Sequence, residues 1–247
     1  MRAFWKLTLT QAKLYLREPI ATFFTIAYAP MMLVLFATIY GNEPTPMFGG
    51  RGTVDIGVPA YIGLIILSVG LMGLPIATAT SRETGVLRRY RATPLRPATY
   101  LAADVLVYFG MTLLGVLLLI LVGKVGYDMR FDGHIVSVML GFSLGAMAFF
   151  ACGFLIASLS PTARIAQTVG MVLAFPMMFI SGATIPLEIL PEGVRSVARF
   201  IPLTHVVTLL RGIWAGETWS AHLTEVAVLL GVLIVGVIVS AKTFRWE

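Results

Sequence analysis

The sequence has few residues of the kinds that carry chemistry. Of its 247 residues 12% are charged, three are histidines and one is a cysteine. Cys152 lies within an apolar run and has no partner, so an intramolecular disulfide is excluded. His134, His205 and His222 are scattered along the chain, which favours a structural role for each of them over a metal site.

Motifs of enzymes are missing as well. The chain contains no H-E-x-x-H, no G-x-S-x-G and no clustered carboxylates, so it predicts no catalytic residues and no cofactor of its own. A nucleotide-binding P-loop is also lacking, since Gly123-Lys124 is followed by Val125 and has no glycine at the required upstream position. If the protein transports a compound, the energy that drives transport must therefore come from outside the chain.

What the chain has in abundance is apolar sequence. Hydrophobic residues make up 58% and the mean hydropathy is +0.90. Several runs reach the roughly 20 residues that a helix needs to cross a bilayer. The sequence predicts an all-α membrane protein that forms one transmembrane domain over residues 1–247. Its six spans are expected at 20–40, 57–80, 100–124, 135–159, 165–181 and 225–241.

Basic residues indicate how these spans are oriented. With the N-terminus in the cytosol, the inner segments hold twelve of the 18 lysines and arginines, whereas most acids fall in the outer loops. We therefore expect a multi-pass protein of the plasma (inner) membrane with both termini cytoplasmic. Topology also explains the net charge of +6 better than nucleic-acid binding does. A cleavable signal peptide is not expected, because the first apolar run is of full span length and no A-x-A-like site follows it.

The most unusual stretch is a charged segment at residues 81–97, SRETGVLRRYRATPLRP, between the second and third spans. A short helix is expected here, with Val86, Leu87 and Tyr90 on one face, and prolines end it. Residues 81–97 would form a rigid bent connection, called the elbow below, across the cytosolic ends of two spans. An ordinary positive-inside loop, which needs arginines but no fixed shape, explains the charges equally well. Asp104, near the same membrane face, is expected to pair with an arginine of the elbow.

Two further segments depart from simple spans. Residues 1–18 carry a basic stripe of Arg2, Lys6, Lys13 and Arg17 beside apolar sides, which predicts a helix lying in the membrane interface and contacting lipids. A topology-setting tail is the alternative. Residues 182–219 are apolar but interrupted by prolines, and each half is too short to span. They predict a re-entrant helical hairpin buried against protein, or alternatively a pair of helices lying on the outer surface.

Two motifs carry a resemblance to a known family. Residues 82–87, RETGVL, followed by Arg89 and by 92–94, ATP, resemble the conserved cytosolic loop of type-2 ABC export permeases, in particular the daunorubicin-resistance branch. Residues 185–191 and 202–211 resemble the segment that precedes the last span in that family. The resemblance covers the whole chain in order and spacing. It implies a six-helix subunit that dimerises and binds two copies of a separate ATPase, which holds the ATP and magnesium.

The resemblance and the residue patterns together give three sets of candidate site residues. The first, implied by the family to act as the coupling helix, is Arg82, Glu83, Gly85, Val86, Leu87, Arg89 and Tyr90. The second would line a substrate path between the second and fifth spans of two protomers, and consists of Leu71, Met72, Pro75, Met171, Phe175, Met177 and Met178. The third would gate the outer end, and consists of Pro186, Pro191, Pro202 and His205. Helix packing alone is an equally open interpretation of the second set.

Three classes of function remain to be compared. An ATP-driven exporter subunit fits both motifs, and its cargo would be hydrophobic or amphipathic, such as a drug, a lipid or a lipid-linked compound, because the spans offer few hydrogen-bonding groups. A membrane-embedded enzyme would need a polar catalytic cluster. A secondary transporter or channel would need charges within the membrane or an inverted repeat, and the sequence displays neither.

Overall fold

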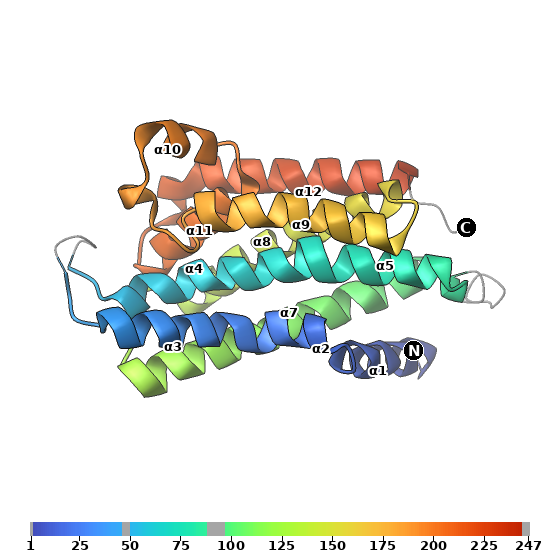
Figure 1. Ribbon diagram of the computed structural model, residues 1–247, viewed down its shortest axis with the longest axis horizontal. Helices are drawn as coiled ribbons and strands as arrows, with labels where there is room; N and C mark the ends of the chain where they lie inside the picture. The colour runs from blue at the N-terminus through green and yellow to red at the C-terminus, as the bar shows by residue number, and fades with distance from the viewer. Residues whose placement is uncertain (1, 46–49, 88–96, 244–247) are drawn as a thin grey trace.

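Six helical segments that are long and apolar enough to cross a membrane run side by side along the molecule (Figure 1). The structure is a computed structural model and describes residues 2–45, 50–87 and 97–243. Within these ranges the only extended pairing is an isolated bridge between Thr45 and Arg51. The predicted all-α class with six spans is confirmed. The spans are Pro19–Tyr40, Thr53–Glu83, Thr99–Tyr127, Ile135–Leu159, Ala163–Ile180 and Trp219–Thr243.

Two of these spans are built from three helical pieces each. The first consists of α2 (Pro19–Thr22), the π-helical η1 (Phe23–Ala27) and α3 (Tyr28–Tyr40), and the second of α4 (Thr53–Leu67), the π-helical η3 (Ser68–Gly73) and α5 (Leu74–Glu83). The other long helices are α7 (Pro97–Tyr127), α8 (Ile135–Leu159), α9 (Ala163–Ile180) and α12 (Leu223–Thr243). The short elements are α1 (Arg2–Leu16), η4 (Leu187–Ile189), α10 (Glu192–Ala198), α11 (Pro202–Trp214) and η5 (Trp219–His222).

The bundle has two distinct ends. At the first, which we call the terminal end, lie α1, the end of α5 at Glu83, and the turn between α8 and α9 (Figure 1). Thr243, the last described residue of α12, is hydrogen-bonded there to Ser158 of α8, at 2.7 Å between the hydroxyl oxygens. At the opposite end, the far end, lie residues 41–45 and 50–52 of the first connection, the connection 128–134 and residues 181–222. Both described ends of the chain are therefore on one side of the bundle, as an even number of spans requires.

The second span forms the centre of the bundle. Of its most apolar window 78% is buried, against 17% for each of the last two spans. The large side chains Phe142, Phe149 and Phe150 of α8 are fully buried in the same core. A Cβ at Gly153 of α8 would collide with the carbonyl oxygen of Gly70 in η3. The helix α8 and the second span are therefore in close backbone contact. The fifth and sixth spans keep wide apolar surfaces that this chain does not cover.

A π-helical segment interrupts the second span beside Pro75, where the sequence contains a proline within an apolar run. Proline has no N–H, so the carbonyl of Leu71, four residues earlier, loses its usual helical donor. The backbone widens instead, and the N–H of Leu74 donates to the carbonyl of Val69. The Leu71 carbonyl faces Gly170 of α9, where any Cβ would collide with it. The irregularity thus brings the second and fifth spans into close backbone contact.

A buried carboxylate fixes the start of the second span at the far end. Asp55 is 2% exposed and accepts hydrogen bonds from the backbone N–H groups of Gly52 (3.1 Å) and Arg130 (2.8 Å). Asn42 accepts from the N–H of Val54 (3.0 Å) and donates to the carbonyl of Tyr127 (3.0 Å). These contacts start the helix at Thr53, four residues earlier than the expected boundary at 57. They also join two connections that are far apart in sequence.

Residues 182–219, for which a re-entrant hairpin or a pair of outer surface helices was expected, contain two short helices that differ in burial. The second half, α11, is too short to span and is buried against α4, α8 and α12. A Cβ at Gly63, ten residues into the 31-residue second span, would contact Val207 and Leu203, so the start of α11 lies roughly a third of the way along that span from the far end. The first half, α10, was expected to be buried too, but among its residues only Ala198 is, and Phe200 just beyond it is 88% exposed. The reason is that α10 packs mainly on α9, at the edge of the bundle.

The predicted N-terminal helix is present as α1 and packs on the start of α7. Tyr15 is buried and its hydroxyl pairs with Thr25 of η1, with 2.6 Å between the oxygens. Burial raises the pKa of Tyr15 to about 12, so its hydroxyl stays protonated at neutral pH. Trp5, Leu9 and Leu16 remain exposed, and their position beside the exposed lysines is typical of a helix in a lipid interface.

The buried carboxylate generates a test of the fold. We expect Asp55→Ala to lower the free energy of unfolding by about 3 kcal/mol, because backbone N–H groups then lose a charged acceptor. Thermal unfolding in detergent measures the change. Glu43→Ala is the matched control, since Glu43 is an exposed carboxylate of the same connection and its loss is expected to be neutral. Equal stability of the two variants would contradict the role given to Asp55.

Candidate functional site

At the terminal end the motif residues Arg82 and Glu83 hold the turn between α8 and α9. Arg82 donates to the carbonyls of Ala157 (3.1 Å) and Ser160, at the end of α8. The carboxylate of Glu83 accepts from the backbone N–H of Ala163 (2.9 Å), the first residue of α9. A cation at the C-terminus of one helix and an anion at the N-terminus of the next are both favoured by the helix dipole. We call these two residues with residues 157–163 the clamp.

The chain turns sharply directly after the clamp. Gly85 has a φ of +71°, a conformation that side-chain-bearing residues rarely adopt, and Val86 and Leu87 resume helical structure. A single short helix was expected over this segment, but its first residues belong to α5, because α5 continues to Glu83. The motif thus supplies both the end of one helix and the start of the next.

Leu87 does not present a docking surface. It is fully buried in a small cluster with Leu7 of α1 and with Tyr100 and Ala103 of α7. Its side chain therefore fixes the segment after Gly85 against the N-terminal helix, a role that the spacing of apolar residues did not reveal. Two of the candidate coupling residues, Arg89 and Tyr90, lie outside the described residues.

Of the candidate path residues, some are covered and some are accessible. Leu71 and Pro75 are buried within this one chain, so they line no open surface here. Met72 and Met171 border a cavity of about 220 Å³ together with Tyr15 and Thr25. The second and fifth spans, which were expected to face each other across two protomers, are in contact within this chain.

The remaining path candidates lie on α9. Phe175 is 53% exposed, while Met177 and Met178 are half-buried. The hydroxyl of Tyr28, on α3, donates to the sulfur of Met178 at 3.6 Å. The exposed side of α9 therefore carries apolar side chains close to the first span.

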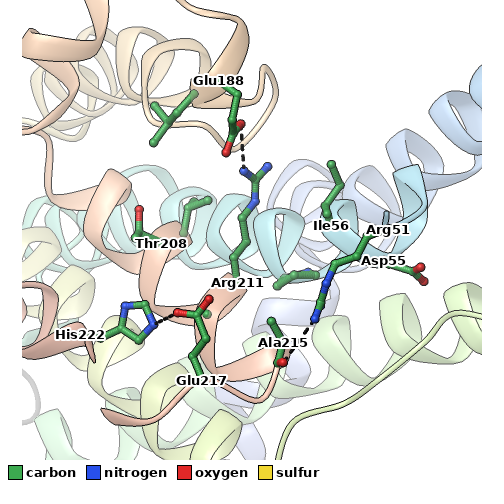
Figure 2. A pocket seen from close by; sticks show the side chains of 13 residues that line it. Arg51, Asp55, Ile56, Glu188, Thr208, Arg211, Ala215, Glu217 and His222 are labelled. Carbon is green, nitrogen blue, oxygen red and sulfur yellow. Dashed lines mark hydrogen bonds and ion pairs between the residues drawn. The ribbon is translucent and has the colours of Figure 1, made fainter. Parts of the chain in front are cut away.

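The far end holds a polar chamber of about 330 Å³ (Figure 2). Two arginines cross it. Arg51 reaches from its connection to the carbonyl of Ala215 (3.3 Å), and Arg211 of α11 reaches toward Glu188 of η4, with 4.0 Å between nitrogen and oxygen. His222 is hydrogen-bonded to Glu217 at 2.9 Å beside them. This chamber joins α4, η4, α11 and η5.

Two arginines hold segment 182–190 in place. Arg211 of α11 donates to the carbonyl of Gly182 (2.9 Å). Arg195 of α10 donates to the carbonyls of Leu187, Glu188 and Leu190. Backbone carbonyls outside regular helices need such donors. The segment is therefore fixed by side chains rather than by helical hydrogen bonds.

The gate candidates occupy the corners of this region. Pro186 precedes η4, Pro191 precedes α10, and Pro202 is the first residue of α11. The Nε2 atom of His205 is hydrogen-bonded to the carbonyl of Arg199 at 2.9 Å, which connects α11 to the end of α10. The three prolines stand where short helices begin, and His205 joins two of these helices. Among the described residues there is no group of histidines, cysteines and acids that could hold a metal ion.

Comparison with known proteins decides the family. Residues 2–214 match the model of the family described as ABC-2 type transporter. The chain belongs to the ABC-2 type transporter family. The six candidate spans agree with the membrane-spanning part of such a transporter.

Individual relatives of this ABC-2 permease are distant. It is 27% identical over 180 residues to the inner membrane transport permease YhhJ of Escherichia coli (strain K12), which covers 70% of this chain and 47% of that protein. Nodulation protein J of Rhizobium leguminosarum bv. viciae is 27% identical over 124 residues, 45% of this chain and 48% of that protein. ABC transporter G family member 20 of Dictyostelium discoideum is 23% identical over 208 residues, 81% of this chain and 28% of that protein. The permease thus spans less than half the length of each.

Sequence reasoning missed the polar residues of the far end. Asp55 was counted only as an outer acid, and Arg211 only as part of a family motif. The signal that was present is a charged residue inside an apolar stretch, since α11 carries Arg211 in its last turn and is otherwise buried. A charge at such a position persists only with partners.

The clamp yields a prediction about the ABC-2 permease in isolation. Glu83→Ala leaves the N–H of Ala163 without its acceptor, so opening of the first turn of α9 is expected to become easier by about 1 kcal/mol, or about fivefold. Hydrogen exchange of a peptide covering residues 160–168 measures this. Glu192→Ala, which removes an exposed carboxylate from the first turn of α10, is expected to leave that peptide unchanged. Unchanged exchange in Glu83→Ala as well would remove Glu83 from the clamp.

Proposed function

We propose that this permease is the membrane subunit of an ATP-driven exporter that moves a hydrophobic or amphipathic compound out of the cell. The observation that carries the proposal is the clamp, in a chain of the ABC-2 family. Arg82 and Glu83, which belong to the family-like motif, connect the segment between the second and third spans to the ends of α8 and α9. A movement imposed on that segment therefore acts on three spans at once.

The coupling role falls on residues 82–90. Arg82 and Glu83 transmit the movement, Gly85 permits the turn, and Leu87 anchors the segment on α1. Val86, Arg89 and Tyr90 are assigned to contact with the ATPase. Two copies of that separate ATPase, which binds ATP and magnesium, complete the complex with a dimer of this chain. The apolar surfaces of the last two spans that this chain leaves uncovered are available to a second copy or to lipid.

The proposed cargo follows from the exposed side chains along the bundle. Met72, Met171 and Phe175 are apolar and accessible, and methionines adapt to ligands of varied shape. Drugs, lipids and lipid-linked compounds fit such a surface, and a drug would agree with the daunorubicin-resistance branch. Residues 182–219 would gate the far end.

We assign the terminal end to the cytosol and the far end to the outside of an inner membrane, a location that the name of the relative YhhJ also carries. The excess of basic residues in the segments of the terminal end supports this orientation. Both termini are then cytoplasmic. In this orientation the coupling segment would face an ATPase in the cytosol.

Cysteine labelling tests the orientation. In a Cys152→Ala background, Glu43→Cys and Asp132→Cys are expected to react with a membrane-impermeant maleimide in intact cells, because both positions lie exposed at the far end. Thr84→Cys, exposed at the terminal end, is expected to react only after the cells are opened. The reverse pattern would overturn the orientation.

Transport of a hydrophobic dye in vesicles that contain the permease and its ATPase tests the route. Phe175→Asp is expected to lower ATP-dependent export at least tenfold, since a charge on an apolar path opposes passage of apolar cargo. Val169→Asp places the same charge on another exposed side of α9 and serves as the control. Only complexes that assemble with equal yield are compared. Undiminished export by Phe175→Asp would show that the dye takes another path, and export without the ATPase would refute the proposed function itself.

A further inference from the structure

A second cavity of about 660 Å³ adjoins the polar chamber at the far end. Its walls come from α3, from the start of α4 and from residues 183–189, and are largely apolar. Phe36, Ile56, Ile185, Pro186 and Ile189 are among them. Cavities of about 300–1,000 Å³ with apolar walls and a few polar groups are the usual form of small-molecule sites. Arg211 and Ile56 border both the chamber and this cavity.

Unused hydrogen-bonding groups gather around this cavity. In the described part of the chain, six buried side-chain nitrogen or oxygen atoms have no hydrogen-bond partner. Three of them belong to residues that line the cavity: the Nε of Arg211 and the Oγ1 atoms of Thr45 and Thr184. Buried polar groups are normally paired, so three unpaired ones around one cavity point to a partner that the chain does not supply.

The chemistry of these groups selects the partner. A guanidinium Nε can only donate, and a threonine hydroxyl can donate as well as accept. The groups therefore suit a molecule that brings acceptor oxygens. Arg211 also keeps charge to offer, because the one ion pair described for it is long, 4.0 Å to Glu188, whose side chain is 63% exposed. A cationic ligand is disfavoured by the same guanidinium.

We propose that this cavity binds an amphipathic anion, with a carboxylate or phosphate group held by Arg211, Thr45 and Thr184 and an apolar body between α3, α4 and segment 183–189. The inference deepens the proposed function by naming the chemical class of cargo, and it depends on that function only for the statement that the ligand is transported. Binding itself concerns this chain alone. Segment 182–190 covers the site, so its release from Arg211 would open the way out.

Binding of radiolabelled probes to the chain in lipid nanodiscs tests the site, with empty discs subtracted. The probes are decanoate, decyl phosphate and decanol, which share an apolar chain and differ in the head. Both anions are expected to bind the wild type more tightly than decanol. Arg211→Gln is expected to weaken binding of the anions about tenfold or more, since a hydrogen-bonded charge pair is lost, and to leave decanol within about twofold. Arg211→Lys should retain part of the preference.

Two further variants separate binding from folding. Thr184→Val removes a hydroxyl that the chain itself does not use, so it is expected to preserve stability and to weaken binding of the anions about threefold. Arg199→Gln, at an exposed arginine next to α10, is the control for loss of a positive charge. Equal binding of decanoate and decanol, or anion binding unchanged in both Arg211→Gln and Thr184→Val, would overturn the inference.

Disc composition distinguishes cargo from membrane lipid as the source of the anion. If phosphatidylglycerol discs weaken decanoate binding relative to phosphatidylcholine discs for the wild type but not for Arg211→Gln, an anionic headgroup occupies the site, and equal binding in both discs points to a free amphipathic anion. Either result supports the site. No binding of either anion above empty discs would refute it. Since this assay needs no ATPase, its failure would leave dye export untouched, and failure of export would leave the site untouched.

Discussion

Satisfying polar backbone groups inside an apolar bundle is the constraint on which this structure depends. No water competes for such groups within a membrane, so every interruption of a helix needs a partner from the chain. Pro75 removes one donor and the backbone widens into a π-helix. The ends of α8 and α9 rely on Arg82 and Glu83, and the start of α4 relies on Asp55. In these three places a charged side chain lies where a helix begins or ends and supplies the missing partner.

Because of this constraint, charged residues lie at both ends of the second span. The second span begins with Asp55 at the far end, finishes with Arg82 and Glu83 at the terminal end, and is the most buried of the six. The chamber and the larger cavity adjoin its first half, and the clamp adjoins its last turn. A displacement of one end of this continuous helical segment is thus transmitted along its backbone to the other end. Pro59 in α4 and the π-helical turns near its middle interrupt the regular hydrogen-bond pattern.

The sequence allowed the spans to be predicted well, because apolar length and charged boundaries are local properties. Partners that come from distant segments were not accessible to it. Leu87 was expected on one face of the coupling helix with Val86 and Tyr90, yet Leu7 and Tyr100 bury it. The helix that begins at Thr53 was expected later, because Asn42 and the distant Arg130 create its start. Arg211 borders two cavities, and this position depends on tertiary packing that the sequence pattern does not contain. Periodicity finds the face of a helix but not what covers that face.

The buried hydrogen bonds and the exposed ion pairs at the far end differ in their response to ionic strength. Asp55 is buried and holds backbone dipoles, so dissolved ions cannot replace or screen its contacts. The ion pairs of Arg51 with Asp132 and of Lys124 with Asp128 are solvent-accessible, and the range of such attractions shrinks to about 8 Å at physiological salt. The contacts that start α4 therefore persist as ionic strength rises. The exposed ion pairs of the outer connections weaken under the same conditions.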